Sequence, residues 1–510
     1  MRLFLIVCSA YSFSFLLLTR CTSPQQSHTA AASPMTPYYI AGEPDQHSII
    51  LHARLNTSFD LVGQDLAGLR ADGYFEVSED SSFANAYKTE WLSANSKNDY
   101  ILKTLVANLK PGTRYYYRAV YGPLQSSAGK GPIATFSTLP DTLSTAPFSF
   151  IVASCMNYER FLGLVPLANP GERNPWAVPA APQDSALGYP AFDVILRQYP
   201  AAFWVGNGDN VYYDVPKEQR AKTEQEMRAK WHRLFAFPRT RNFLAQVPTY
   251  WTKDDHDFRN NDCDTTNEYF TEPSNWLGKY IFREQVPITF PVDPSMVNYR
   301  THRVNQDLQI WFTEGREHRT PLSRPDGPDK SLWGAEQLAW LKRTLKESDA
   351  TFKIIVSPTP MVGPDDHRLP GDTITLDKRD NHADIGGYRH EGDAFFSWLQ
   401  SNGLGGDQVF IINGDRHWQY HSIHPSGIHE FCTGAFVAQN ARLGRKPGEP
   451  NSSDPEGRVR QPYIQEKPSG GFVRVSTEGA TQPGQLASIH FQIIEETGKP
   501  LHTYSAKRVR

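Results

Sequence analysis

The sequence predicts an α/β fold in which a small all-β domain precedes a larger, layered α/β domain. Short strand-like runs separated by turn residues fill residues 38–140, a pattern typical of a β-sandwich. From residue 147 onward, strand-like runs alternate with helical patterns, which indicates layers of helix and sheet. Several of the later strands end in side chains that can bind metal ions. A chain of 510 residues is long enough for two or three domains.

The composition is that of a folded globular protein. Hydrophobic residues make up 39% of the chain and aromatic residues 12%, which excludes a mainly disordered protein. The formal net charge of -3 argues against a general nucleic-acid binder, which would usually carry a concentrated basic face. We therefore expect no specific nucleic-acid partner.

Residues 1–21 predict an export leader. A basic start at Arg2 precedes an apolar run that is too short to span a bilayer comfortably, as in a secretion signal. Cys21 follows this run as at a bacterial lipoprotein cleavage site, but Arg20 replaces the small residue expected there, so lipidation and ordinary cleavage near residues 30–32 both stay open. Residues 22–37, rich in Ser, Thr, Ala and Pro, predict a flexible tether. We expect a periplasmic, outer-membrane-anchored or extracellular bacterial protein.

The all-β domain is predicted over residues 38–140. Its strand-like runs cover residues 48–54, 74–78, 100–105, 115–121 and 132–138. The stretch from Leu109 to Tyr117 resembles the strand entry of fibronectin type III-like domains. That resemblance implies a sandwich whose tyrosines belong to the core, so we assign no chemistry to this domain.

Helices and strands alternate in the second domain, after a linker near residues 139–147. Helical spacing of apolar residues predicts helices over residues 217–235, 331–345 and 393–399, with Ser331 as a candidate cap. Residues 487–494 and 501–507 predict a hairpin, and residues 442–469 a solvated loop. The scattered Cys155, Cys263 and Cys432 do not form a disulfide framework; a pair between Cys263 and Cys432 has no support from spacing.

Four strand-like runs of this domain deliver metal-competent side chains at their carboxyl ends, where ligands bind in open α/β sheets. The runs at residues 148–153, 202–205, 247–251 and 409–413 lead to Cys155, to Asp209 and Tyr212, to Asp255 and His256, and to Asp415 and His417. Any one of these residues could be a helix cap or an inert buried side chain. The set is too rich for one small ion, whereas two ions about 3.5–4 Å apart that share one carboxylate would use it fully.

The motifs that carry these residues are Gly208-Asp209-Asn210-Val211-Tyr212, Asp254-Asp255-His256-Asp257 with Asn260-Asn261, and Gly414-Asp415-Arg416-His417-Trp418. Together they resemble the alkaline phosphatase D (PhoD-like) family of the calcineurin-like metallophosphoesterase superfamily, over nearly the whole chain. The resemblance implies a layered β-sandwich flanked by helices as the catalytic domain over residues 147–510, after the small all-β domain.

The resemblance also implies a ligand set. Asp209 would bridge two metals, and Cys155, Tyr212 and His417 would hold the first, a ferric ion stabilised by a thiolate and a phenolate. Asp255 and Asp415, with Asn261 as a further candidate, would hold a hard divalent ion such as calcium, with magnesium, manganese or zinc as substitutes. Relatives such as the purple acid phosphatases offer another His near residues 357–360, where this chain has none.

His256 and Arg416 are the predicted catalytic side chains beside these ligands. His256 would donate a proton to the phosphate or the leaving oxygen. Arg416 would neutralise phosphate charge, with a salt bridge pointing away from the site as an equal alternative. The implied reaction is in-line attack by a metal-bound hydroxide on a phosphate ester.

Three functions compete at this point. The leading one is an exported phosphatase or phosphodiesterase acting on phosphate esters, with phospholipase D-like or wall-polymer phosphodiesterase activity as an alternative. A non-catalytic surface-anchored binding protein would require a broken metal set, and the set is nearly complete. A serine hydrolase lacks its Gly-x-Ser-x-Gly elbow. The natural substrate and the oligomeric state are not predicted.

Overall fold

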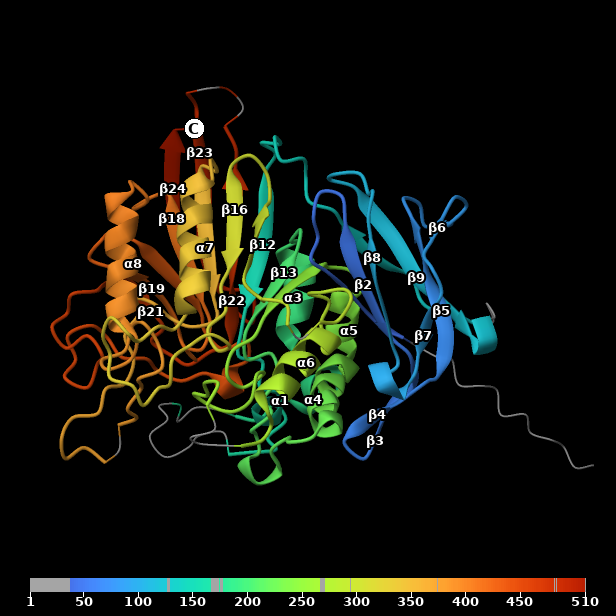
Figure 1. Ribbon diagram of the computed structural model, residues 1–510, viewed down its shortest axis with the longest axis horizontal. Helices are drawn as coiled ribbons and strands as arrows, with labels where there is room; N and C mark the ends of the chain where they lie inside the picture. The colour runs from blue at the N-terminus through green and yellow to red at the C-terminus, as the bar shows by residue number, and fades with distance from the viewer. Residues whose placement is uncertain are drawn as a thin grey trace, which may run out of the picture. The chain divides into compact units, whose positions relative to one another are not determined.

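Two β-sheets packed face to face form the centre of the fold (Figure 1). The computed structural model describes residues 37–125, 129–166, 174, 178–266, 271–293, 295–373, 375–480, 482 and 484–509. Within these residues the first sheet has the strand order β24 (Pro500–Val509), β23 (Leu486–Glu495), β22 (Gly471–Glu478), β12 (Phe148–Ala153), β13 (Trp204–Asn207), β14 (Thr249–Thr252), β1 (Tyr38–Gly42), β2 (Ile49–Arg54) and β8 (Ile101–Val106). The second has the order β15 (Arg300–Arg303), β16 (Leu308–Phe312), β17 (Phe352–Ser357), β18 (Val409–Asn413), β20 (His429–Thr433), β19 (Gln419–Ile423) and β21 (Arg460–Ile464).

Side-chain alternation along the strands explains why both faces of each sheet are buried. On β12, Phe150 and Val152 belong to the core between the two sheets, whereas Ile151 and Ala153 belong to the core on the outer face. Successive strand residues point to opposite faces, so a continuous apolar run of this kind needs cover on both sides. The predicted α/β class with a layered, helix-flanked β-sandwich is confirmed.

Helices supply the outer cover. The outer face of the first sheet packs against aromatic residues of four helices: α3 (Pro190–Gln198), α4 (Glu224–Ala236), α5 (Pro238–Leu244) and α6 (Asn275–Gln285). Two shorter helices, α1 (Tyr158–Phe161) and α2 (Pro182–Leu187), precede α3 in the chain. The second sheet is covered by α7 (Gly334–Glu347) and α8 (Arg389–Ser401) (Figure 1). On α7, the fully buried Leu341 and Leu345 are each worth about 1.5–3 kcal/mol relative to exposure.

The amino-terminal strands form the predicted all-β part. β5 (Ala71–Ser78) pairs with β9 (Arg114–Gly122), and β6 (Tyr87–Lys88), β7 (Leu92–Ala94), β10 (Gly129–Lys130) and β11 (Ala134–Ser137) extend this sheet. It packs on β1, β2 and β8 through a core that includes Phe75, Tyr117 and Phe136. β3 (Asn56–Val62) and β4 (Asp65–Gly68) make a separate pair. Since β1 also pairs with β14 through Gly42 and Thr249, these strands continue the large sheet.

Helix boundaries differ by a few residues from those predicted. A capping box between Thr223 and Glu226 starts α4 at Glu224, so the charged residues before it form only a short 3-10 turn at Lys217–Gln219. α7 starts at Gly334; Ser331 nonetheless accepts a hydrogen bond from the Gly334 N–H at 2.7 Å. α8 extends the predicted third helix at both ends, and the predicted carboxyl-terminal hairpin is β23 and β24.

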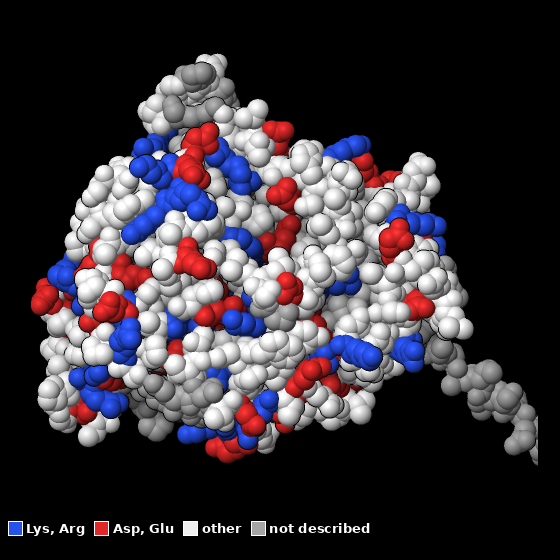
Figure 2. Space-filling view, in the orientation of Figure 1, with Lys and Arg blue, Asp and Glu red and all other residues white. Residues whose placement is uncertain are grey.

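Cys155, Cys263 and Cys432 are buried free thiols, so the pair considered for Cys263 and Cys432 is not formed. The export leader, the tether and Cys21 lie outside the described residues. In the part of the chain that the structure covers, no helix combines the length and the apolar character needed to cross a membrane. On the face shown in Figure 2, Lys and Arg are interspersed with Asp and Glu.

A chain of hydrogen-bonded histidines joins β19, β20 and β24 away from the strand-end residues. His421 pairs through Nδ1 with His502 Nε2 at 3.0 Å and through Nε2 with His429 Nδ1 at 2.9 Å. The Tyr504 hydroxyl contacts His429 Nε2 at 3.3 Å and donates to Asp407 at 3.2 Å. Each bond between two rings needs one protonated and one bare nitrogen, so two histidines that are bonded to each other cannot both be charged.

Acidification is therefore expected to destabilise this region. Burial lowers the pKa of His421 to about 2 and that of His429 to about 4, and Arg460 adds to both shifts. The unfolded chain, with histidine pKa values near 6.5, binds more protons below that pH, so the free energy of unfolding falls by about 2 kcal/mol per histidine between pH 7 and pH 5. Urea denaturation at both pH values checks this. The difference in the free energy of unfolding between pH 7 and pH 5 should be smaller by that amount in His421→Phe and the same as in the wild type in His490→Gln. An unchanged difference in His421→Phe would contradict the role of this histidine chain.

Candidate metal centre

Cys155, Asp209 and Asp415 share an unusual backbone conformation at the carboxyl ends of three strands. Each lies two residues beyond the strand that carries it, after β12, β13 and β18, and their φ angles are 57°, 53° and 64°. Non-glycine residues with positive φ cost about 1–3 kcal/mol each and persist only where the surroundings fix them. Backbone hydrogen bonds fix two of these turns to each other: Cys155 N–H donates to Gly208 O at 3.3 Å and Met156 N–H to Asp209 O at 2.9 Å.

The first group of donors surrounds Asp209. The Cys155 thiol lies 3.5 Å from Asp209 Oδ2, and the Tyr212 hydroxyl lies 3.3 Å from the same oxygen. His417 completes the group, with ligand atoms of Cys155, Asp209 and His417 all within 4.8 Å of one another. Asn440 holds this arrangement from outside, because its amide donates to the Tyr212 oxygen and to the Cys155 carbonyl, both at 3.1 Å.

Two further groups of donors continue from the first, each sharing one residue with the group before it. Asp209, Asp255 and His256 form one, and Asp254, Asp255 and Asp415 form the other, again with ligand atoms within 4.8 Å of one another. Asp209 thus belongs to the first and second groups, and Asp255 to the second and third. A continuous row of three overlapping donor groups can hold more than one cation.

The electrostatics of the row fit bound cations. Asp209 Oδ1 is buried and finds no hydrogen-bond partner among the described residues. Burial and the neighbouring Asp255 raise the pKa of Asp209 well above its usual range, and burial and Asp209 do the same to the pKa values of Cys155 and Tyr212. Anionic donors held this close need positive charge between them. The residues present therefore suit a pair of metal ions.

His256 is held by a carboxylate from the Tyr212 loop. Its Nδ1 lies 2.7 Å from Asp214 Oδ1, its ring packs 4.2 Å from the Tyr212 ring, and its side chain is 12% exposed. Burial disfavours the charged imidazole, but Asp214, Asp255 and Asp209 raise the pKa of His256 well above its usual range. The imidazole thus lies at the rim of the second group, with its ring oriented by Asp214.

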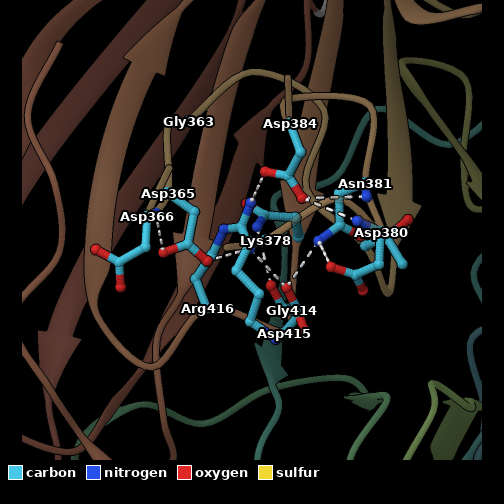
Figure 3. Close-up of polar contacts among 12 residues, drawn as sticks. Gly363, Asp365, Asp366, Lys378, Asp380, Asn381, Asp384, Gly414, Asp415 and Arg416 are labelled. Atoms are coloured by element: carbon cyan, nitrogen blue, oxygen red, sulfur yellow. Dashed lines mark hydrogen bonds and ion pairs between the residues drawn. The ribbon is translucent and has the colours of Figure 1, made fainter. Parts of the chain in front are cut away.

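The position of the Arg416 guanidinium does not fit its predicted catalytic role. Its guanidinium contacts Asp365 at 2.6 Å and Asp384 and Asp415 at 3.0 Å, and its side chain is 1% exposed (Figure 3). A buried guanidinium that already neutralises carboxylates has little to offer a phosphate. This is the salt-bridge alternative weighed from the sequence, and it makes Arg416 a positioning residue for Asp415.

Asn261 also differs from expectation. It is exposed, and its backbone N–H donates to Asp214 Oδ2 at 2.9 Å. The amide that contacts a predicted ligand is instead Asn381, whose Nδ2 lies 3.1 Å from Asp415 Oδ2. The structure brings the other predicted ligands and His256 together, namely Cys155, Asp209, Tyr212, His417, Asp255, His256 and Asp415.

Sequence reasoning missed several residues of the site. Asp254 was visible beside Asp255, but nothing in a strand-end motif says which of two adjacent carboxylates faces the site. Arg316 is fully buried and binds Asp254 through Nε and Asp380 at 3.2 Å. Arg316 lies in a loop and Asn440 at the end of the short 3-10 helix Ala438–Asn440, neither in a recognisable spacing, so only tertiary structure could reveal them.

A cavity of about 750 Å³ opens next to the Asp255 and Asp415 end of the row. It connects to the donors through Asp262, whose backbone N–H donates to Asp255 Oδ2 at 2.5 Å. Its lining is mostly charged or polar and includes Asp262, Asp326, Asp377, Asp380, Arg324 and Arg379, with Leu322 and Pro325 as apolar members. The volume suits a small organic group attached to a bound ester.

Two packed sheets with metal-binding side chains at the ends of β12, β13, β14 and β18 define a metallophosphoesterase fold. Residues 150–483 match the family model of the PhoD-like phosphatase, and residues 17–140 match the model of its N-terminal domain. The chain belongs to the PhoD-like phosphatase family.

Individual relatives are distant. Alkaline phosphatase D of Bacillus subtilis (strain 168) is 21% identical over 417 residues, which cover 75% of this chain and 64% of the relative's length. A solved structure of PhoD superposes with a TM-score of 0.67 at 17% identity, over 94% of this chain and 90% of that one. A purple acid phosphatase from yellow lupin (Lupinus luteus) gives a TM-score of 0.56 at 11% identity, over 92% and 74%. At these identities the solved structures show the shared fold.

Proposed function

We propose that this protein is an exported, metal-dependent phosphatase or phosphodiesterase that hydrolyses phosphate esters at a dinuclear centre. The observation that carries the proposal is the row of overlapping donor groups in which Asp209 and Asp255 are each shared. A carboxylate shared between two groups is what a pair of adjacent ions requires. Family membership supports the same class of reaction, and the leader at residues 1–21 supports export.

The donor chemistry differs along the row. Cys155, Tyr212 and His417, with Asp209, would hold a ferric ion, because an anionic sulfur and an anionic phenol oxygen stabilise high charge. Asp254, Asp255 and Asp415 offer oxygen atoms, which suit a hard divalent ion such as calcium, magnesium or manganese. When bound, such ions would supply Lewis-acid chemistry, lowering the pKa of water and neutralising charge on the phosphate ester.

The protein's own groups orient the ester and move the proton. His256 would donate from its ring to the leaving oxygen, and Asp214 on the opposite ring nitrogen would hold the ring in place. The left-handed turns at Asp209 and Asp415 would keep the carboxylates fixed while the substrate changes shape.

The cavity is lined by charged side chains and by apolar surface that includes Leu322 and Pro325, so it can take a leaving group with both polar and apolar parts. A small ester, a polar polymer and a phospholipid headgroup are therefore all candidate substrates. The non-catalytic binding protein is disfavoured because the donor set is intact.

Hydrolysis of p-nitrophenyl phosphate and of its bis-ester, before and after removal of metal ions with a chelator, tests the proposed function. We expect at least one of the two to be hydrolysed by the holoprotein, and the activity to disappear with the metals and return when they are restored. Activity that survives complete metal removal would contradict the proposal. The ratio of the two rates separates phosphatase from phosphodiesterase.

His256→Gln is expected to slow the hydrolysis of alkyl phosphate esters far more than that of p-nitrophenyl esters. A general acid contributes about 10²–10⁴-fold when the leaving alcohol is a poor leaving group, and little when it departs readily as p-nitrophenolate.

Asp214→Asn keeps the oxygen that accepts from Asn261 but removes the charge, so it should lower the pKa of His256. Because the protonated ring is the active form, the alkaline limb of the pH–rate profile should then move to lower pH. If His256→Gln lowered the hydrolysis rates of both ester types equally, and Asp214→Asn left the alkaline limb of the pH–rate profile in place, His256 would not be the general acid.

A further inference from the structure

Asn440 is a buried amide that contacts two donors of the first group at once. It is 1% exposed, and its Nδ2 lies 3.1 Å from the Tyr212 hydroxyl oxygen and 3.1 Å from the Cys155 carbonyl oxygen. A carbonyl oxygen can only accept a hydrogen bond, so the amide atom that faces Cys155 must be the nitrogen. The second hydrogen of that nitrogen is then available to the Tyr212 oxygen. The direction of both hydrogen bonds is therefore fixed by the chemistry of the partners.

The segment that carries Asn440 is tied by its backbone to the loops of the first group. On one side of Asn440, the Phe436 N–H donates to the Ser154 carbonyl at 3.0 Å. On the other side, the Arg442 N–H donates to the His417 carbonyl at 2.9 Å. These contacts hold the segment against the turns that deliver Cys155 and His417, so the position of the Asn440 amide relative to the first group is set from both directions.

The Tyr212 oxygen lies between a carboxylate and the Asn440 amide. As a hydroxyl it donates to Asp209 Oδ2 at 3.3 Å and accepts from Asn440. As a phenolate ligand it has no hydrogen to donate, but it still accepts from the Asn440 N–H. A hydrogen bond withdraws electron density from an anionic oxygen, and partners of this kind both orient a metal ligand and tune the metal.

We propose that Asn440 is a positioning residue that holds Tyr212 and Cys155 in the arrangement of the first ion and limits how strongly the Tyr212 oxygen donates charge to that ion. The amide does this without a charge of its own and without contact to the substrate. This inference rests on the proposed function, because it presupposes a ferric ion in the first group. It adds a residue that sets the electronic properties of that ion.

Asn440→Leu removes both hydrogen bonds and keeps the size of the side chain. In a ferric phenolate, visible light moves an electron from the oxygen to the iron, and a hydrogen bond lowers the energy of the electrons on the oxygen. We therefore expect the visible absorption maximum of the iron-loaded variant to lie at longer wavelength than that of the wild type. The Kd of iron, measured by competition with a chelator, should rise about 10–100-fold, the cost of removing a partner that orients a metal ligand.

Asn413→Leu is the matched control. Asn413 is fully buried, and its Nδ2 also donates to a tyrosine oxygen and a carbonyl oxygen, those of Tyr420 at 3.1 Å and Gly414 at 2.9 Å. Tyr420 is not a candidate ligand, and its hydroxyl donates to Glu430 at 2.9 Å. The absorption maximum of Asn413→Leu should stay at the wild-type wavelength.

The outcomes separate the inference from the proposed function. An iron-loaded Asn440→Leu with the wild-type absorption maximum, or an equal shift in Asn413→Leu, would overturn the role of Asn440. A wild type that takes up no iron would overturn the proposed ferric ion instead.

Resonance Raman spectra of the wild type cover the case in which Asn440→Leu does not fold. Excitation in the same absorption band reports the C–O stretching frequency of the iron-bound tyrosine. This frequency should shift when the protein is prepared in heavy water, because the Asn440 N–H donor becomes N–D, and Asn440→Ala, which only removes atoms, should lack the shift. No shift in the wild type, or the same shift in the wild type and Asn440→Ala, would overturn the inference.

Discussion

Asp209→Asn is expected to lower phosphate-ester hydrolysis by about 10²–10³-fold, the size of loss found when a group that stabilises the transition state directly is removed. Asp209 belongs to two of the three donor groups, so the amide would weaken both metal positions at once. The substitution keeps the size of the side chain and the left-handed turn, which asparagine tolerates well. Initial rates with p-nitrophenyl phosphate or its bis-ester, at saturating metal, provide the measurement.

Asp307→Asn is the control for Asp209→Asn. Asp307 is also fully buried, but it precedes β16 at the end of the strand opposite to the site and accepts a hydrogen bond from Thr351 at 2.6 Å. Its replacement should lower stability and leave the turnover of the folded protein near the wild-type value. If Asp209→Asn retained wild-type turnover as well, the shared carboxylate would have no part in catalysis.

Cys155→Ser is expected to abolish tight binding of the first metal and, with it, most of the activity. A hydroxyl in place of the thiol is a poor ligand because it does not ionise in the physiological range, whereas a metal-bound thiol is deprotonated outright. We expect iron content, measured by elemental analysis of the purified variant, to fall at least about tenfold, the loss of affinity that even a supporting residue of a metal site can cause. Calcium content should fall less, since Asp254, Asp255 and Asp415 are untouched.

Cys432→Ser provides a matched comparison. Cys432 is a fully buried free thiol of β20, and its sulfur accepts a hydrogen bond from the Gly434 N–H at 3.4 Å, an interaction that serine can make. Iron content should stay at the wild-type level in this variant. Equal iron content in wild type, Cys155→Ser and Cys432→Ser would remove Cys155 from the ligand set.

The strand-end residues were predictable because their positions follow from backbone rules. A strand of a layered α/β domain that ends in a short turn brings the next residues to the edge shared by its neighbours. Cys155, Asp209 and Asp415 obey this rule, each two residues past its strand. The tyrosine and histidines follow at short spacings from those positions, so local sequence was sufficient to find them.

Other parts of the fold depend on contacts that no local pattern encodes. The pairing of β1 with β14 joins segments far apart in the chain, so the continuous sheet could not be read from strand-like runs alone. Arg416 illustrates the same limit at the site. Its position between two ligands suggested a phosphate contact, but Asp365 and Asp384, from distant loops, turn its guanidinium into the interior. Asn261 illustrates it too, because its loop leaves the residue exposed beside the cavity and bonds its backbone N–H to Asp214, a contact between two loops that no local pattern encodes.

The central claim is that donors from four strand ends surround two adjacent cations. Anomalous X-ray diffraction from crystals of the metal-loaded protein, collected on both sides of the iron absorption edge, tests it most directly. The structure predicts two metal peaks about 3.5–4 Å apart with Asp209 between them, and the iron signal confined to the peak beside Cys155, Tyr212 and His417. A single peak, or two peaks that do not share Asp209, would contradict it.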